Sequence, residues 1–128
     1  MKRILVLDDD VDTCNLIQFV FRKDSIEVIT TIDTRDALHR LKTEPIDLLL
    51  LDVVLPDFNG IDLCHLIAKD MGFDTLPIIL MSAHINLPPF DIRINGRDLP
   101  SAFLSKPFSI GELRQAVLDS LAVPMVVM

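Results

Sequence analysis

Acidic residues follow directly after two short apolar runs, and this pattern constrains the fold more than any other feature. Three aspartates (residues 8–10) follow the apolar run 4–7, and Asp52 follows the apolar run 48–51. A short run that is apolar throughout predicts a strand buried on both faces, as in a parallel sheet. Open α/β folds place their ligand sites at the carboxyl edge of the sheet. We therefore expect both acidic groups to meet at one edge of a single sheet.

Such a cluster of carboxylates needs a source of positive charge, because neighbouring negative groups repel one another. A divalent cation that prefers oxygen ligands, such as Mg²⁺, fits that need. A lysine later in the chain, Lys106, can supply a second positive charge. The acids therefore predict a magnesium site assisted by an ammonium group.

Length and composition bound the class of protein. The chain has 128 residues, half of them hydrophobic, which suits one domain with a substantial core, and we assign it to residues 1–122 with an apolar tail at 123–128. The net charge of −7 argues against direct contact with nucleic acid, because phosphate binding depends on clustered Lys and Arg. No apolar run approaches the roughly 20 residues that span a bilayer, so we expect a cytoplasmic protein without membrane contact. Cys14 and Cys64 are expected to be buried, reduced thiols.

Strand and helix signals alternate along the chain. Strand signals fall at residues 3–8, 26–30, 47–52, 77–82 and 102–105, and most of the gaps carry a helical period. This alternation predicts right-handed βαβ crossovers, and hence an α/β fold with a doubly wound, five-stranded parallel sheet. Capping residues are predicted at Asp9 or Asp10, at Asp33 or Thr34, and at Ser109.

The helical periods also predict which side chains face the core. In the first helix these are Val11, Cys14, Ile17, Val20 and Phe21. The second helix is expected to bury Ala37, Leu38 and Leu41, the third Ile61, Leu63, Leu66, Ile67 and Met71, and the last Leu113, Val117, Leu118 and Leu121.

The stretch from residue 84 to residue 101 breaks this rhythm. It contains three prolines and an Asn-Gly pair, and its apolar residues follow no clean period. Proline in the interior of a helix removes a hydrogen bond and clashes with the preceding turn. A fourth helix there is expected to be irregular, short, displaced or absent.

Four groups of residues fall at the ends of predicted strands: Asp8 with Asp9, Asp52, Ser82, and Lys106 followed by proline. The surrounding motifs are Leu-Asp-Asp-Asp, Leu-Asp-Val-Val-Leu-Pro-Asp-Phe-Asn-Gly, Met-Ser-Ala and Ser-Lys-Pro-Phe. In this order and on this fold, the set resembles the receiver domain of two-component response regulators, over about residues 2 to 121. The resemblance implies a flavodoxin-like sheet with strand order 2-1-3-4-5.

The resemblance also implies a role for each residue. Asp52 would accept a phosphoryl group from a sensor histidine kinase or a histidine phosphotransfer protein. Asp9 and Asp52 would bind Mg²⁺ directly, Asp8 would act through water or by positioning, and the backbone carbonyl of Val54 would supply a further oxygen. Lys106 would offset the repulsion between the two anions during transfer. The Lys106–Pro107 bond is expected to be cis.

Further residues are assigned to switching and tuning. Ser82 would donate its hydroxyl to a phosphate oxygen and swing inward, and Phe103 would follow it from an exposed to a buried rotamer. An ordinary rim aromatic is an equally good interpretation of Phe103. Val54, apolar where many relatives are polar, and His84 are expected to tune the lifetime of the phosphoryl group, although a lone histidine is more often a surface residue.

These assignments favour a phosphorylation-dependent signalling switch rather than a turnover enzyme. The alternative is a receiver-like interaction module that works without phosphate. A phosphohydrolase with an aspartate nucleophile would carry a second acid where Val54 stands. A nucleotide-binding flavodoxin-like protein would carry a phosphate-binding loop where the three aspartates lie, and these repel phosphate. The sequence identifies neither the cognate kinase nor the downstream partner.

Overall fold

The computed structural model of the chain describes residues 1–83, 92–94 and 97–122. In chain order the elements are β1 (Lys2–Leu7), α1 (Val11–Phe21), β2 (Ile26–Thr31), α2 (Thr34–Thr43), β3 (Leu48–Asp52), α3 (Gly60–His65), a π-helical turn (Leu66–Asp70) that continues α3, β4 (Ile78–Ser82), β5 (Ile92–Ile94), β6 (Arg97–Leu99), β7 (Ala102–Ser105) and α4 (Ile110–Leu121).

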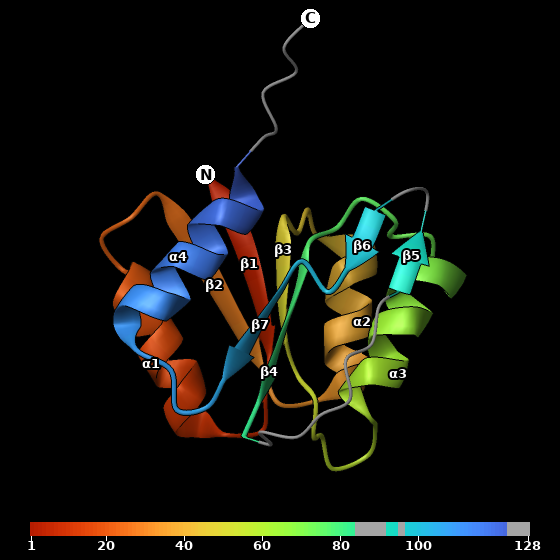
Figure 1. The fold of residues 1–128 in the computed structure, drawn as a ribbon, viewed down its shortest axis with the longest axis horizontal. Coiled ribbons are helices and arrows are strands. Elements are labelled where there is room, and N and C mark those ends of the chain that lie inside the picture. The colour runs from red at the N-terminus through yellow and green to blue at the C-terminus, as the bar shows by residue number, and fades with distance from the viewer. Residues whose placement is uncertain (84–91, 95–96, 123–128) are drawn as a thin grey trace, which may run out of the picture.

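Five of the strands form one parallel sheet in the order β2-β1-β3-β4-β7. Helices α1 and α4 lie on one side of this sheet, and α2 and α3 lie on the other (Figure 1). The arrangement confirms the predicted doubly wound sheet, with β7 as the fifth strand of the order 2-1-3-4-5. Parallel strands need long crossover connections, which are usually helical, and this explains why strand and helix signals alternate along most of the sequence.

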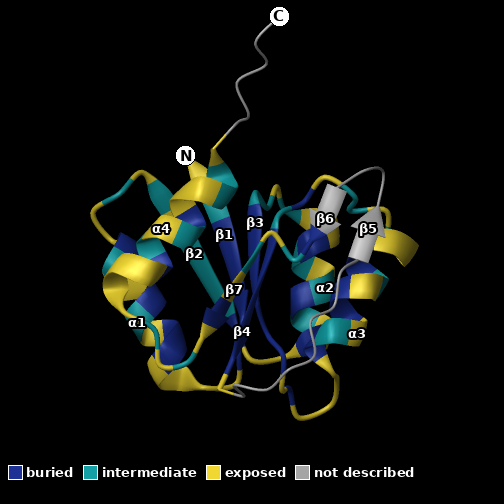
Figure 2. Cartoon of the chain, viewed as in Figure 1, coloured by how far each residue is buried: buried dark blue, intermediate teal, exposed yellow. Residues whose placement is uncertain are grey.

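The apolar strands are continuous because each of them faces two cores. Successive strand residues point to opposite faces, and the central strands β3 and β4 are buried throughout (Figure 2). The core beneath α2 and α3 takes one set of strand residues, namely Leu5, Leu7, Leu49, Leu51, Ile78 and Leu80. The core beneath α1 and α4 takes the alternate set, namely Ile4, Val6, Leu48, Leu50, Ile79 and Met81.

Helix starts follow the expected capping chemistry. Asp10, Asp33 and Ser109 are the N-caps of α1, α2 and α4, and the side chain of each accepts a backbone N–H of the first turn. Asn59 caps α3 in the same way.

Two of the predicted core residues are wrong. Val11 is exposed at the first position of α1, and Leu118 is exposed on α4. Val11 lies in the first turn, before the helix packs on the sheet. On α4, the buried face is narrower than the apolar face predicted from the sequence, because only Leu113 and Val117 are buried in that helix.

The segment between β4 and β7 differs most from expectation. Its described residues form an antiparallel pair, with Ile92 opposite Leu99 and Ile94 opposite Arg97, where the sequence predicted a helix that is irregular, short, displaced or absent and no strands. The sequence signal is the Asn-Gly pair between two short runs, which is typical of a hairpin. Figure 1 shows this pair in front of α2 and α3, and Leu99 is buried in the same core as those helices. His84 lies outside the described residues.

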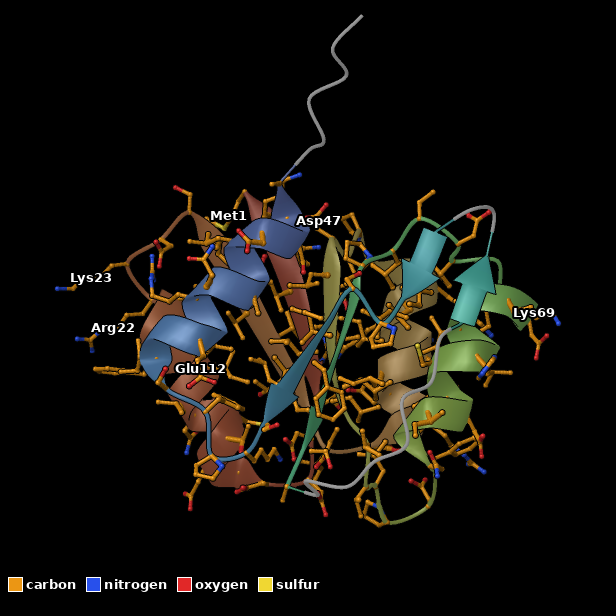
Figure 3. The ribbon with its side chains drawn as sticks, viewed as in Figure 1. Met1, Arg22, Lys23, Asp47, Lys69 and Glu112 are labelled. Carbon is orange, nitrogen blue, oxygen red and sulfur yellow. The ribbon has the colours of Figure 1, made fainter. Side chains whose placement is uncertain are left out.

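Two smaller findings concern cysteine and membrane contact. Cys14 and Cys64 are buried and not in a disulfide, as predicted. Within residues 1–83, 92–94 and 97–122, no helix has the length and apolarity that crossing a bilayer requires. The side chains drawn in Figure 3 fill the space between sheet and helices, whereas Arg22 and Lys23 project outward beyond α1.

Candidate phosphoacceptor and metal site

Strand register brings the sequence-predicted residues to one edge of the sheet. Leu7 of β1 pairs with Leu51 of β3, so Asp8 and Asp52 follow at neighbouring positions. Asp52 in turn pairs with Met81 of β4, which places Ser82 beyond it. Ser82 in turn pairs with Ser105 of the next strand, β7. The backbone N–H of the following residue, Lys106, donates to the carbonyl of Ser82 at 2.7 Å. The four groups named from the sequence therefore converge, as expected from strand ends that share an edge.

Asp8 is the most buried of these acids. Its side chain is fully removed from solvent. Oδ1 accepts the backbone N–H of Asp10 at 2.9 Å, and Oδ2 accepts Nζ of Lys106 at 2.6 Å. A buried carboxylate must be paired or hydrogen-bonded to be tolerated, and Asp8 has both kinds of partner.

Asp52 lies beside Asp8 and shares the same lysine. Its Oδ2 accepts Nζ of Lys106 at 3.3 Å, and its Oδ1 accepts the backbone N–H of Val54 at 3.1 Å. Only 6% of Asp52 is exposed. One ammonium group thus bridges two carboxylates that come from different strands.

Asp8, Asp52 and Lys106 form an acidic corner at this edge of the sheet, and their charges shift the pKa values of Asp8 and Lys106. Burial raises the pKa of Asp8 above its ordinary value, the negative charge of Asp52 raises it further, and the hydrogen bond from Lys106 acts in the opposite direction. Burial by itself lowers the pKa of Lys106. The hydrogen bond and charge of Asp8, together with the charge of Asp52, more than offset that effect, so the pKa of Lys106 is raised. The corner therefore holds more negative charge than one lysine neutralises.

The donor set fits a hard divalent cation. Asp8, Asp9 and Asp52 each present a carboxylate oxygen, and these three atoms lie within 4.8 Å of one another. Asp9 is exposed whereas the other two are buried, so the group opens to solvent on one side. Carboxylate oxygens at this spacing are ligands of the kind that Mg²⁺ takes.

The residues assigned to switching and tuning have less distinctive surroundings. Ser82 is fully buried at the end of β4. Phe103 on β7 is 40% exposed, and the Val54 side chain is 55% exposed in the loop after β3. Both Lys106–Pro107, as predicted, and Leu99–Pro100, which the sequence analysis missed, are cis peptide bonds.

Gly60 supports the site for a reason that the motif alone did not reveal. The backbone N–H of Gly60 donates to the carbonyl of Val53 at 2.7 Å. A Cβ atom at Gly60 would overlap the backbone oxygen of Asp52 and come within 2.7 Å of the Val53 Cα atom. Close approach to the end of β3 is therefore the constraint that requires glycine at this position.

Asp57, in the loop after β3, is exposed but still has a hydrogen-bond partner. The hydroxyl of Thr34, at the start of α2, donates to Asp57 Oδ1 at 3.1 Å. No sequence signal pointed to this pair, because the two residues are 23 positions apart and meet only through the fold.

A five-stranded parallel sheet with an acidic corner bridged by a lysine defines a receiver domain. The family model for the response regulator receiver domain matches residues 4–118. The chain therefore belongs to the receiver domain family of two-component response regulators.

Curated relatives agree with this assignment. The chain is 33% identical over 117 residues to the alkaline phosphatase synthesis transcriptional regulatory protein PhoP of Bacillus subtilis, covering 91% of this chain and 47% of PhoP. It is 31% identical over 112 residues to the DNA-binding response regulator MtrA of Mycobacterium tuberculosis, covering 88% of this chain and 47% of MtrA. Protein PilG of Pseudomonas aeruginosa is 31% identical, over 90% of this chain and 84% of PilG. The chain thus spans about half the length of PhoP and MtrA.

Solved structures show the same fold. The response regulator TrrA of Thermotoga maritima, in complex with Mg²⁺-BeF, superposes with a TM-score of 0.74 and 28% identity, over 94% of this chain and all of TrrA. The receiver domain of a Francisella response regulator superposes with a TM-score of 0.75 and 28% identity, over 94% of this chain and 97% of that chain.

Proposed function

We propose that this receiver domain is a phosphorylation-dependent switch that accepts a phosphoryl group on Asp52 from a sensor histidine kinase or a histidine phosphotransfer protein. The observation that carries the proposal is the shared lysine, since Nζ of Lys106 contacts both Asp8 and Asp52 in a corner with excess negative charge. Membership of the receiver family supports the same chemistry.

Asp52 is proposed as the nucleophile. In the proposed transfer, one of its carboxylate oxygens forms a bond to phosphorus while the bond between phosphorus and the donor's leaving atom breaks. An anion attacks an anion in this step, so nearby positive charge lowers the barrier. Lys106 supplies one such charge at 3.3 Å from Oδ2. The buried hydroxyl of Ser82 is proposed to donate to a phosphoryl oxygen.

Three carboxylates are proposed to hold Mg²⁺. Asp9 and Asp52 would bind the ion directly, the backbone carbonyl of Val54 would add an oxygen, and Asp8 would act through water or by positioning. When bound, the ion would offset phosphoryl charge as a Lewis acid. The donor set of Asp8, Asp9 and Asp52 supports this assignment, and the relative TrrA was solved with Mg²⁺-BeF.

The experiment is phosphorylation with a small donor. The purified chain is incubated with acetyl phosphate and Mg²⁺ and separated on a Phos-tag gel. We expect a slower band that needs Mg²⁺ and is absent in Asp52→Asn. A band that survives Asp52→Asn would show that another residue is the acceptor. No band with either acetyl phosphate or a phosphorylated histidine donor would favour the phosphate-independent interaction module.

Val54 is proposed to tune the lifetime of the phosphoryl group, together with His84. The Val54 side chain is 55% exposed two residues after Asp52 and has no polar atom to orient a water molecule. Replacing it by asparagine adds such an atom without a large change in size. We expect Val54→Asn to increase the rate of dephosphorylation several-fold, measured as loss of the phosphorylated band after donor removal. An unchanged rate would contradict the role.

Phe103 is proposed to change from an exposed to a buried rotamer when Asp52 is phosphorylated. It is 40% exposed on β7, one strand away from Ser82. Burial of its ring upon phosphorylation would require no hydrogen-bond partner, since phenylalanine carries no hydroxyl. Selective labelling of phenylalanine rings and comparison of their NMR signals before and after phosphorylation tests this movement.

A further inference from the structure

The loop after β3 is held from outside the acidic corner, by the start of α2. The hydroxyl of Thr34 donates to Asp57 Oδ1 at 3.1 Å, and Thr34 is only 3% exposed. A buried hydroxyl is costly to leave unpaired. This bond therefore fixes the position of Asp57, although the carboxylate itself lies at the surface.

The start of α2 is in turn connected to the acidic corner. The backbone N–H of Asp8 donates to the carbonyl of Thr31 at 3.2 Å. The hydroxyl of Thr31 accepts the backbone N–H of Asp33 at 3.2 Å, and Asp33 caps the helix that begins at Thr34. A hydrogen-bonded path thus runs from Asp8, through the end of β2, to the residue that holds the loop.

The loop itself is short and connected to the acceptor. The backbone N–H of Val54 donates to Asp52 Oδ1, and Val54 forms an antiparallel bridge with Asn59. The backbone N–H of Leu55 donates to the carbonyl of Phe58 at 3.2 Å. Asp57 lies within this small turn, so a bond that fixes Asp57 also restrains the backbone at Val54.

We propose that Thr34 and Asp57 are positioning residues, and that the hydrogen bond between them holds the loop after β3 so that the backbone carbonyl of Val54 lies ready for a divalent cation. This inference rests on the proposed function for its ligand. Neither Thr34 nor Asp57 belongs to the group of carboxylates proposed to hold the cation. They act through the loop backbone.

The test uses variants that separate the hydrogen bond from side-chain shape. Thr34→Val keeps the volume and removes the hydroxyl, whereas Thr34→Ser keeps the hydroxyl. Asp57→Ala removes the acceptor, whereas Asp57→Asn keeps an acceptor oxygen. The double variant Thr34→Val with Asp57→Ala completes a thermodynamic cycle.

Two measurements are made on the full chain without a phosphodonor. The first is amide hydrogen exchange of residues 53–59 in metal-free buffer. The second is a titration with MgCl₂ followed by amide NMR signals, because the chain has no Trp or Tyr to serve as a fluorescent probe. We expect Thr34→Val and Asp57→Ala each to accelerate loop exchange and to weaken Mg²⁺ binding by about fivefold, the size of one net hydrogen bond.

The controls define which result overturns the inference. Thr34→Ser and Asp57→Asn should remain near wild type, and the double variant should be no worse than either single variant. Faster exchange with unchanged Mg²⁺ affinity would overturn the proposal, because the bond would then be merely structural. Additive losses in the double variant would also overturn it.

Failure of the proposed function would appear elsewhere in the same experiment. It would show as absence of Mg²⁺ binding in the wild-type chain, or as binding that Asp52→Asn leaves unchanged. Failure of the positioning role would show as a normal wild-type titration that Thr34→Val does not alter. The two outcomes are therefore distinguishable.

Discussion

Two pairings of aspartate with a cation join the last part of the chain to its beginning, and they differ in kind. Lys106 contacts Asp8 and Asp52 in a buried corner. Arg114 on α4 contacts Asp24, after α1, with two guanidinium nitrogens at 2.9 and 3.2 Å, on the surface. In the first, two acids share one cation and the pKa of Asp8 is raised; in the second, one acid has one cation and the pKa of Asp24 is lowered.

The difference separates a site from a structural contact. A surface carboxylate that is already neutralised by its own cation does not require a further ligand. A buried cluster of carboxylates that its own cation does not fully neutralise lowers the stability of the folded protein. Binding of a further cation raises that stability.

The backbone behind the buried corner should be the least tolerant feature. Gly60→Ala places a Cβ atom against the Asp52 carbonyl, and we expect it to lower the free energy of unfolding by about 3 kcal/mol, measured by urea denaturation and circular dichroism. Gly111→Ala is the matched control, because a Cβ at Gly111 meets its nearest neighbour, the Ser109 hydroxyl, at an ordinary 3.8 Å. Equal stability of the two variants would contradict the close-approach argument.

Removing each cation compares the two pairings directly. Lys106→Met leaves the buried Asp8 without its ammonium partner, and we expect a loss of about 2 kcal/mol in the free energy of unfolding at neutral pH. Arg114→Met removes a surface cation, and its loss should be clearly smaller. Urea midpoints of both variants measure the contrast. A larger loss for Arg114→Met would reverse our interpretation of the two regions.

Neutralising the acceptor should stabilise the corner. Asp52→Asn removes one of the repelling charges while it keeps the side-chain shape, so the free energy of unfolding should rise by about 1 kcal/mol in metal-free buffer. Mg²⁺ should then raise the melting temperature of the wild type more than that of the variant. Equal responses to Mg²⁺ would show that Asp52 does not contribute to the cation site.

The stability that the pair of Arg114 and Asp24 contributes should depend on pH. Because Arg114 lowers the pKa of Asp24, the pair contributes stability above the ordinary Asp pKa and loses it as pH falls through the lowered value. The difference in melting temperature between wild type and Asp24→Asn should therefore be largest near neutral pH and vanish at strongly acidic pH. A difference that grows on acidification would have the wrong sign.

The acidic corner was predictable because its residues lie at strand ends. Once residues 4–7 and 48–51 are identified as parallel strands, the shared edge brings Asp8 and Asp52 together without further information. The Ser-Lys-Pro-Phe motif predicted that Lys106 would join them. The sequence could not supply the Arg114–Asp24 contact or the Thr34–Asp57 bond, because both depend on how elements distant in sequence pack.

The weaker predictions failed where periodicity is a poor guide. Val11 and Leu118 have apolar side chains in helical register, yet both are exposed, Val11 because it lies in the first turn of α1 and Leu118 because the buried face of α4 is narrower than its apolar pattern. Between β4 and β7, the described residues 92–94 and 97–99 form a strand pair, which could have been predicted only by giving more weight to the Asn-Gly signal. The constraint at Gly60 could not be predicted, because the close approach of its backbone to Asp52 and Val53 is visible only in the structure.

The burial of β3 and β4 has a mechanical consequence. Both strands are buried along their whole length, and close-packed interiors yield little to local stress. A bulky anion attached at the end of β3 would therefore not displace the buried strands. Under the proposed function, the structural response would therefore fall on the loops at this edge of the sheet and on exposed side chains such as Phe103, rather than on the backbones of β3 and β4.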